Sequence, residues 1–201
     1  MILLIAVILG LIAGWARARR GGRSYEAVHL RLEWLVFLAF IPQLLAFHLP
    51  GTSQQFPDRW VPVVLVGTQA LLLVFAWVNR KQPGFWALGL GLFLNFTIIA
   101  LNNGWMPIST ETVQQLAPHA PAGLFQVGQR LGSSKDLILA SGSIHLGFLA
   151  DRFTLPQWFP YRVAFSLGDI FISVGAFWIL WSLGGITICT QEVEHDKYIT
   201  V

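Results

Sequence analysis

The sequence predicts an all-α integral membrane protein with five transmembrane helices. Hydrophobic residues make up 55% of its 201 residues and charged residues only 11%, whereas soluble domains average roughly 45 to 50% and about 25%. Five apolar runs follow one another along the chain, and most of the basic residues gather in short polar stretches between them. That arrangement is typical of a multi-pass protein with its basic loops in the cytoplasm.

The first apolar run, residues 2–16, has no basic residue ahead of it and is followed by "RARRGGR". A cleaved signal peptide carries its positive charge in front of the apolar stretch. The sequence therefore predicts a retained span with an outer N-terminus, because the positive-inside rule places the arginines of residues 17–23 in the cytoplasm.

Spans two to four follow at residues 32–49, 61–78 and 85–101. The second is expected to run outward and to end at "HLPGTSQQFPDRW", which is rich in turn-forming residues. The third runs inward and ends at "NRKQPG", so that Arg80 and Lys81 also fall on the cytoplasmic side. The fourth runs outward and ends at "NNGWMP", where Asn, Gly and Pro interrupt a helix.

Residues 102–162 form the longest connection and are predicted to be an outer segment of short helices. One helix is expected in "STETVQQLA", capped by Ser109 or Thr110, and a second in "SSKDLILA", where Ser133 and Asp136 have the spacing of a capping box. Residues 137–150 are too short and too glycine-rich to cross a bilayer, so they are re-entrant, interfacial or packed under the spans. The aromatic residues of "LPQWFPYR" suit a membrane interface.

The fifth span is expected at residues 167–186, running inward and leaving residues 187–201 as a cytoplasmic tail. The chain then forms a single transmembrane domain from residue 1 to residue 201. Ser166 and Asp169 match the capping-box pattern directly before this span, so they are interpreted as the cap of its first turn.

Several polar residues inside or beside the spans are candidates for binding. Asn95 and Gln69 lie within apolar runs, where an amide is expected to bond to a neighbouring helix. Asn95, Asn102 and Asn103 form a candidate ligand site if they face the same outer cavity as Asp169. Gly10 and Gly14 form a G-x-x-x-G pair that allows close approach of a helix of this chain or of a partner.

Histidine provides a third candidate chemistry. His48 and His145 are both expected near the outer face, where neutral imidazole can ligate a pigment metal or bond to a quinone. Two isolated histidines lack the ligand spacing of a metal site, so no metal and no cofactor are predicted, and interfacial hydrogen bonding is the favoured interpretation. Nucleic-acid binding is not expected, because membrane topology explains the basic residues.

The ordered set "LNF", "NNGWMP", "FLADRFTLP" and "FSLGDIFISVG", after an N-terminal span and an arginine-rich loop, resembles a family of bacterial multi-pass membrane proteins catalogued as a domain of unknown function. The resemblance extends over nearly the whole chain. It implies a location in the bacterial cytoplasmic membrane and assigns no chemistry.

A shorter resemblance covers about a quarter of the chain. "FSLGDIFISVG" is similar to the terminal motif of bacterial lipoprotein signal peptidase, and "GFLADR" is similar to an upstream motif of that family. Ser166 and Phe148 stand where the family has Asn, and Gly168 where it has Ala. The resemblance implies Asp169 as one catalytic acid, but the family's second acid is missing from "FTLPQWFPYRVA", so only Asp151 could complete a pair.

The sequence therefore predicts a non-catalytic accessory or assembly subunit of a larger membrane complex, with the lipid bilayer and other membrane subunits as partners. Two alternatives stay open. One is a membrane-embedded aspartyl peptidase that uses Asp169 and Asp151, and the other is a pigment- or quinone-binding subunit.

Overall fold

The computed structural model describes residues 1–25, 29–49, 51–121, 123–156 and 158–185. Within these residues the chain is mostly helical. Two helical stretches, Ile2–Arg20 and Asp58–Val78, are long and apolar enough to cross a membrane by length and composition alone, and three shorter apolar stretches accompany them. The end of the expected fifth span and the expected tail lie outside the described residues.

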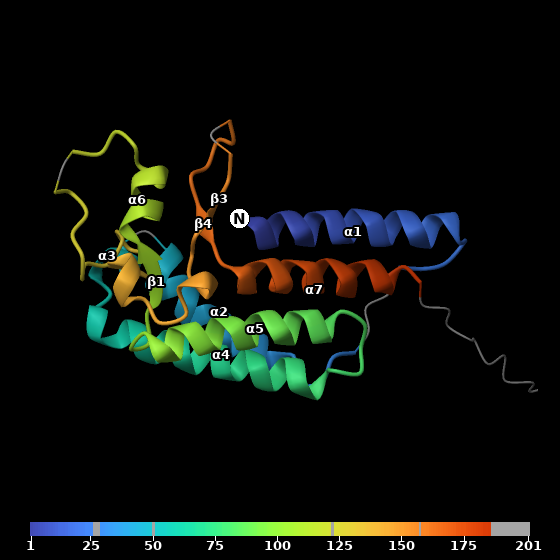
Figure 1. Cartoon of the computed structure of the whole chain (residues 1–201). Helices are drawn as coiled ribbons and strands as arrows, with labels where there is room; N and C mark the ends of the chain where they lie inside the picture. The colour runs from blue at the N-terminus through green and yellow to red at the C-terminus, as the bar shows by residue number, and fades with distance from the viewer. Residues whose placement is uncertain (26–28, 50, 122, 157, 186–201) are drawn as a thin grey trace, which may run out of the picture.

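Five apolar helices form a row. They are α1 (Ile2–Arg20), α2 (Trp34–Gln43), α4 (Val61–Val78), α5 (Phe85–Leu101) and α7 (Leu167–Leu183). Helix α1 packs on α7, α7 on α5, α5 on α4 and α4 on α2. The C-terminal helix therefore lies side by side with the N-terminal one, between α1 and α5 (Figure 1).

Glycine lets α7 approach both of its neighbours closely. A Cβ on Gly168 or Gly175 of α7 would overlap atoms of α5, and a Cβ on Gly91 of α5 would overlap backbone of α7. On the other side of α7, a Cβ on Gly10 or Gly14 of α1 would meet Phe177 and Leu180. The G-x-x-x-G pair thus packs within this chain, and backbone contact replaces side-chain packing along this half of the row.

The other half of the row uses side-chain amides. Asn79, at the end of α4, accepts from the backbone N–H of Arg31 at 2.9 Å and donates to the carbonyl of Arg31 at 2.8 Å, so it holds the start of α2. Near the other end of the pair, Gln43 donates to Thr68 at 2.6 Å. Pro42 lies inside α2, and the chain continues beyond Gln43 as a π-helical turn, η1 (Leu44–His48).

A compact outer segment covers one end of the row (Figure 1). It contains β1 (Met106–Ser109), α6 (Thr110–Leu116), β2 (Asp136–Leu139), two 3-10 turns, η3 (Ser141–Ser143) and η4 (Gly147–Leu149), and the hairpin strands β3 (Phe153–Thr154) and β4 (Ala164–Phe165). The short helices α3 (Thr52–Gln55) and η2 (Asp58–Trp60) lie between α2 and α4. Helix α6 begins with Ser109 as its cap, as predicted.

The second predicted outer helix is wrong. Residues Asp136–Leu139 form strand β2, which pairs in parallel with β1 in the register Met106 to Asp136 and Ile108 to Ile138. The reason is tertiary: an isolated turn of helix is unstable in water, whereas the strand buries Ile138 against Ile108 and Val113. Ser134, and not Ser133, accepts from the backbone N–H of Asp136, in a turn that precedes the strand.

Residues 141–150 pack against the ends of the helices. Leu149 and Ala150 are buried in one cluster with Leu65 of α4 and Ile98 of α5. Among the three placements left open by the sequence, packing onto the helix ends is the observed one. This contact brings Asp151, the next residue, to the outer end of the row.

Candidate functional site

The first part of the candidate site is the start of α7. The Ser166 Oγ accepts from the backbone N–H of Asp169 at 3.0 Å, and the Asp169 Oδ2 accepts from the backbone N–H of Ser166 at 3.1 Å. These reciprocal bonds form a capping box. The two residues of the S-x-x-D pattern lie within one helical turn, so this geometry forms wherever a helix begins at that point of the chain.

Asn95 of α5 joins this cap from the side. Its Nδ2 donates to the Asp169 Oδ1 at 2.8 Å, and its Oδ1 accepts from the Ser166 Oγ at 2.9 Å. Both hydrogen-bonding ends of the amide are therefore used between two helices. Gly168 makes room for it, because a Cβ at that position would overlap the Asn95 side chain.

The second part is a charged cluster from the outer segment. The Lys135 Nζ lies 2.6 Å from the Asp151 Oδ2 and 3.1 Å from the Asp136 Oδ1. Strand pairing sets these positions, because β2 begins at Asp136 and a bridge between Ile108 and Asp151 places Asp151 beside β1. The Asp151 side chain is 2% exposed, and its Oδ1 has no hydrogen-bond partner among the described residues.

Burial and charge shift the protonation of this cluster. Burial raises the pKa of the Asp151 carboxyl, and the carboxylates of Asp136 and Asp169 raise it further, against the lowering effect of Lys135. Burial by itself lowers the pKa of Lys135, but the three surrounding carboxylates outweigh it and hold that pKa above its ordinary value. The ammonium of Lys135 therefore stays charged, and the Asp151 carboxyl takes up a proton at a higher pH than an ordinary aspartate does.

A cavity of about 350 Å³ connects the two parts. The carboxylates of Asp136, Asp151 and Asp169 line it together with Lys135, Asn95 and two further amide side chains, those of Gln43 and Gln69. Its remaining wall is mainly apolar and comes from α1, α4, α5 and α7, including Ile2, Leu72, Leu92 and Ile172. The Gln69 Oε1 is buried and, like the Asp151 Oδ1, has no partner among the described residues.

The structure brings Asp151 and Asp169 into one cavity but gives them different partners. Asp151 bonds to Lys135, and Asp169 bonds to Ser166 and Asn95. Among the described residues, no hydrogen bond joins the two carboxylates. A dyad that shares one proton would need such contact.

The other predicted binding residues are dispersed. Asn102 is buried away from this cavity, where it donates to the carbonyls of Ile98 and His145 and accepts from the backbone N–H of His145. Asn103 is exposed in a turn with φ of 56°. His48 ends η1 and His145 lies between η3 and η4, both exposed. The described residues contain no group of three or more His, Cys, Asp or Glu side chains that could hold a metal ion.

Sequence reasoning did not identify Lys135, Asp136 and Gln43 as site residues. The sequence does contain a sign of the first two: Lys135 and Asp136 are adjacent charged residues in a chain with few charges, and they directly precede the apolar stretch "LILA". Their meeting with Asp151 depends on the parallel pairing of β1 with β2, which no local pattern predicts. Gln43 carries no such sign, because it is a single polar residue that follows Pro42 within an apolar run.

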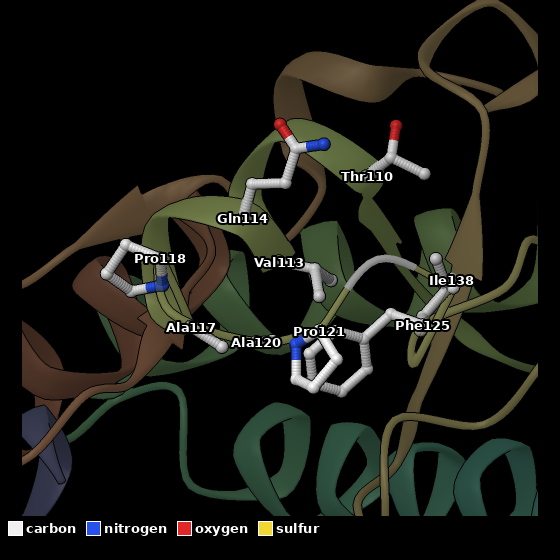
Figure 2. Close-up of a pocket in the computed structure, with 10 residues that line it drawn as sticks. Thr110, Val113, Gln114, Ala117, Pro118, Ala120, Pro121, Phe125 and Ile138 are labelled. Carbon is white, nitrogen blue, oxygen red and sulfur yellow. The ribbon is translucent and has the colours of Figure 1, made fainter.

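A second hollow of about 500 Å³ lies within the outer segment, between α6, the chain that follows it and β2 (Figure 2). Val113, Phe125 and Ile138 form its floor, and Thr110 and Gln114 stand at its edge. None of the side chains that line it is charged. It therefore offers a contact surface and no group for acid–base chemistry.

The chain belongs to a family of unknown function (DUF5317), whose model matches residues 27–181. The predicted membership in an uncharacterised domain family is confirmed. The match is narrower than expected, since α1 and the arginine-rich stretch after it lie outside the matched residues. Comparison with curated proteins and with solved structures found no match.

Proposed function

We propose that this member of the family is a five-span protein of the bacterial cytoplasmic membrane, with its N-terminus and the outer segment on the outer side. Five apolar helices that lie side by side in one row support this topology. The basic end of α1 and the α4–α5 turn with Arg80 and Lys81 lie at the end of the row opposite the outer segment (Figure 1). One orientation then satisfies the positive-inside rule at both loops.

Cysteine labelling tests this orientation. In a chain whose single cysteine, Cys189, is replaced by serine, Ser24→Cys and Ser143→Cys place thiols at exposed positions on the two sides. A membrane-impermeant maleimide added to intact spheroplasts is expected to label position 143 and to reach position 24 only after permeabilisation. Labelling of position 24 in intact spheroplasts would overturn the topology.

We further propose that the protein acts as a non-catalytic accessory or assembly subunit of a membrane complex. The observation that carries this proposal is the open row of helices. The two end helices, α1 and α2, each pack along one helix of the row, and no packed interface joins them within the described residues. Helix α1 buries Gly10, Gly14 and Ala18, and within the described residues many of its large apolar side chains stay exposed, among them Leu4, Leu9 and Ile12.

An uncovered face of this kind suits a neighbouring transmembrane helix, since packing between helices in lipid depends on close fit. Photo-crosslinking provides the test. A photoreactive residue in place of Ile12, which is 58% exposed on α1, is expected to give one discrete crosslinked product in native membranes. The same residue in place of Ala39, which is fully buried, is the matched control and is expected to give none. A single-chain particle in mild detergent together with no product at Ile12 would contradict the proposal.

The shared cavity of Asp151 and Asp169 favours a second candidate, acid-catalysed hydrolysis inside the membrane. Asp151, whose pKa burial raises, would act as the acid and Asp169 as the base. The purified chain is incubated with a fluorogenic peptide library in detergent. Asp169→Asn is expected to abolish cleavage and to preserve the cap, because Asn also accepts from backbone N–H groups. Absence of cleavage by the unmodified chain removes this candidate.

A further inference from the structure

The cavity of Asp151 and Asp169 has a composition that favours one class of ligand. Its outer part is charged, and its inner part is lined by leucine and isoleucine side chains of the helices. A volume of about 350 Å³ falls at the lower end of the range for small-molecule sites, roughly 300 to 1,000 Å³. A molecule with a small polar head and an apolar chain matches a cavity that is charged in one part and apolar in the other.

Acids outnumber bases in the polar part. Three carboxylates line the cavity, and Lys135 is the one basic side chain among them. Its Nζ is already bonded to Asp136 and Asp151. The neighbouring Arg152 side chain points elsewhere, with its guanidinium 5.9 Å from the ring centre of Phe153. The α-amino group of Met1, at the rim, forms no ion pair among the described residues. An anionic head would therefore find no unpaired basic side chain among the residues that line the cavity.

The unpaired atoms of the wall are acceptors. The Asp151 Oδ1 and the Gln69 Oε1 are both buried and both lack a partner among the described residues. A buried acceptor without a donor lacks the hydrogen bonds that water gives it in the unfolded chain, and this costs stability, more so when the acceptor is charged. A ligand that supplies N–H donors and a positive charge would recover this cost, whereas a quinone, which carries only acceptors, would leave it in place.

We infer that this cavity binds an amphipathic primary amine, with the ammonium group at Asp151 and Gln69 and the alkyl chain along α4, α5 and α7. The ammonium carries three donors and one positive charge, so it matches two acceptor oxygens, and its charge favours the ionised form of Asp151 against the burial that raises the pKa of that carboxyl. The apolar chain lies against Leu65, Leu72 and Ile172 and gains from leaving water. This inference requires no partner subunit and no catalytic step.

The test is ligand-dependent thermal stability of the full chain in detergent, with octylamine, octanol and octanoate as probes. All three share the chain and differ in the head. Octylamine is expected to raise the melting temperature in a saturable manner, because a ligand that binds only the folded state stabilises it. Octanol is expected to raise it much less, and octanoate not at all. Equal effects of octylamine and octanol would overturn the inference, because they would show that the alkyl chain alone binds.

Two variants locate the ammonium. Asp151→Asn is expected to weaken octylamine binding by roughly tenfold or more, in line with the loss of a charge-assisted hydrogen bond. Gln69→Leu removes an oxygen that has no partner among the described residues, so this variant should fold normally and weaken binding several-fold. It keeps the inference testable if Asp151→Asn fails to fold. Glu33→Gln, at an exposed acid outside the cavity, is the control and is expected to change nothing. Unchanged octylamine affinity in Gln69→Leu and Asp151→Asn would refute the site.

Discussion

The helical row and the outer segment are held together by different forces. In the row, α7 approaches α1 and α5 through glycine backbones, and polar contacts between helices come from side-chain amides, hydroxyls and the Asp169 carboxylate. In the outer segment, two buried or half-buried cations connect stretches that are distant in the sequence. Arg130 donates to four backbone carbonyls and to Asp58, and Lys135 bonds to two carboxylates. Close packing of helices therefore dominates in the row, whereas the outer segment adds buried cations to its small apolar cluster.

The difference has a physical origin. Helices satisfy their own backbone groups, so the row needs only close packing between them. The outer segment has little regular structure, and many of its carbonyls lack partners in a ladder or helix. Arg130, whose side chain is 7% exposed, binds the carbonyls of Ala46, Phe56, Ser133 and Ser134 and thereby joins three stretches of chain. The comparison predicts that mutations and pH act on the two regions separately.

The largest effect is expected from Arg130→Ala. The substitution leaves several buried carbonyls without donors, each at roughly 1–3 kcal/mol, so the outer segment should lose roughly 3–5 kcal/mol of stability. Limited proteolysis is expected to cut between residues 117 and 135, while circular dichroism retains the helical signal of the row. Arg130→Lys, which keeps the charge but loses the planar fork, should recover only part of the loss. Simultaneous loss of both regions would contradict the comparison.

A smaller loss, in the row, is expected from Gly168→Ala. The added methyl group overlaps Asn95 and the backbone of Gly91, and overpacking of this kind costs roughly 1–3 kcal/mol. The melting temperature in detergent should fall, and the α5–α7 contact should loosen. Gly67→Ala on α4 is the matched control: nothing lies within 4 Å of its added Cβ, so it is expected to stabilise the helix slightly. A similar loss in both variants would show that helix propensity, and not packing, is responsible.

The pH dependence should belong to the outer segment. Because the pKa of Asp151 is raised in the folded chain, folding favours its protonated form. Its contribution to stability is therefore largest below the ordinary aspartate pKa of about 3.9 and declines as the pH rises toward the raised value. Hydrogen exchange in β2 is expected to speed up over that interval.

Asp151→Asn should flatten this dependence, by at most about 1.4 kcal/mol per pH unit for one proton. The raised pKa of Lys135 acts in the same direction at alkaline pH: its contribution to stability is full below the ordinary lysine value and declines as the pH rises from there toward the raised one. Exchange in α5 should stay insensitive to pH over both intervals. If α5 titrated together with β2, the two regions would be one cooperative unit.

The smallest effect is expected from Asp169→Asn. Asn can replace the carboxylate at the cap and still accept from the backbone N–H of Ser166, so α7 should lose only a few tenths of a kcal/mol to about 1 kcal/mol. Ser166→Ala is the sharper comparison, because it removes both the cap bond to Asp169 and the donor to Asn95. A greater loss for Asp169→Asn than for Ser166→Ala would show that the Asp169 charge does more than cap the helix.

The sequence alone determined the helices and the cap. Apolar runs and their turn residues located the five apolar helices within a few residues, because hydrophobic length and helix breakers act locally along the chain. The S-x-x-D spacing did the same for Ser166 and Asp169, whose partners lie within one helical turn. Family membership followed from short motifs that stand in order along the chain.

Only the tertiary structure decided the polar site. Asp151 is separated by 16 residues from Lys135, with which it pairs, and Asn95 reaches a cap 74 residues away. Residues Asp136–Leu139 form a strand because β1 lies beside them, although the local pattern of "SSKDLILA" predicted a helix. Contacts between distant parts of a chain depend on which elements pack together, and a capping box or an apolar run does not carry that information.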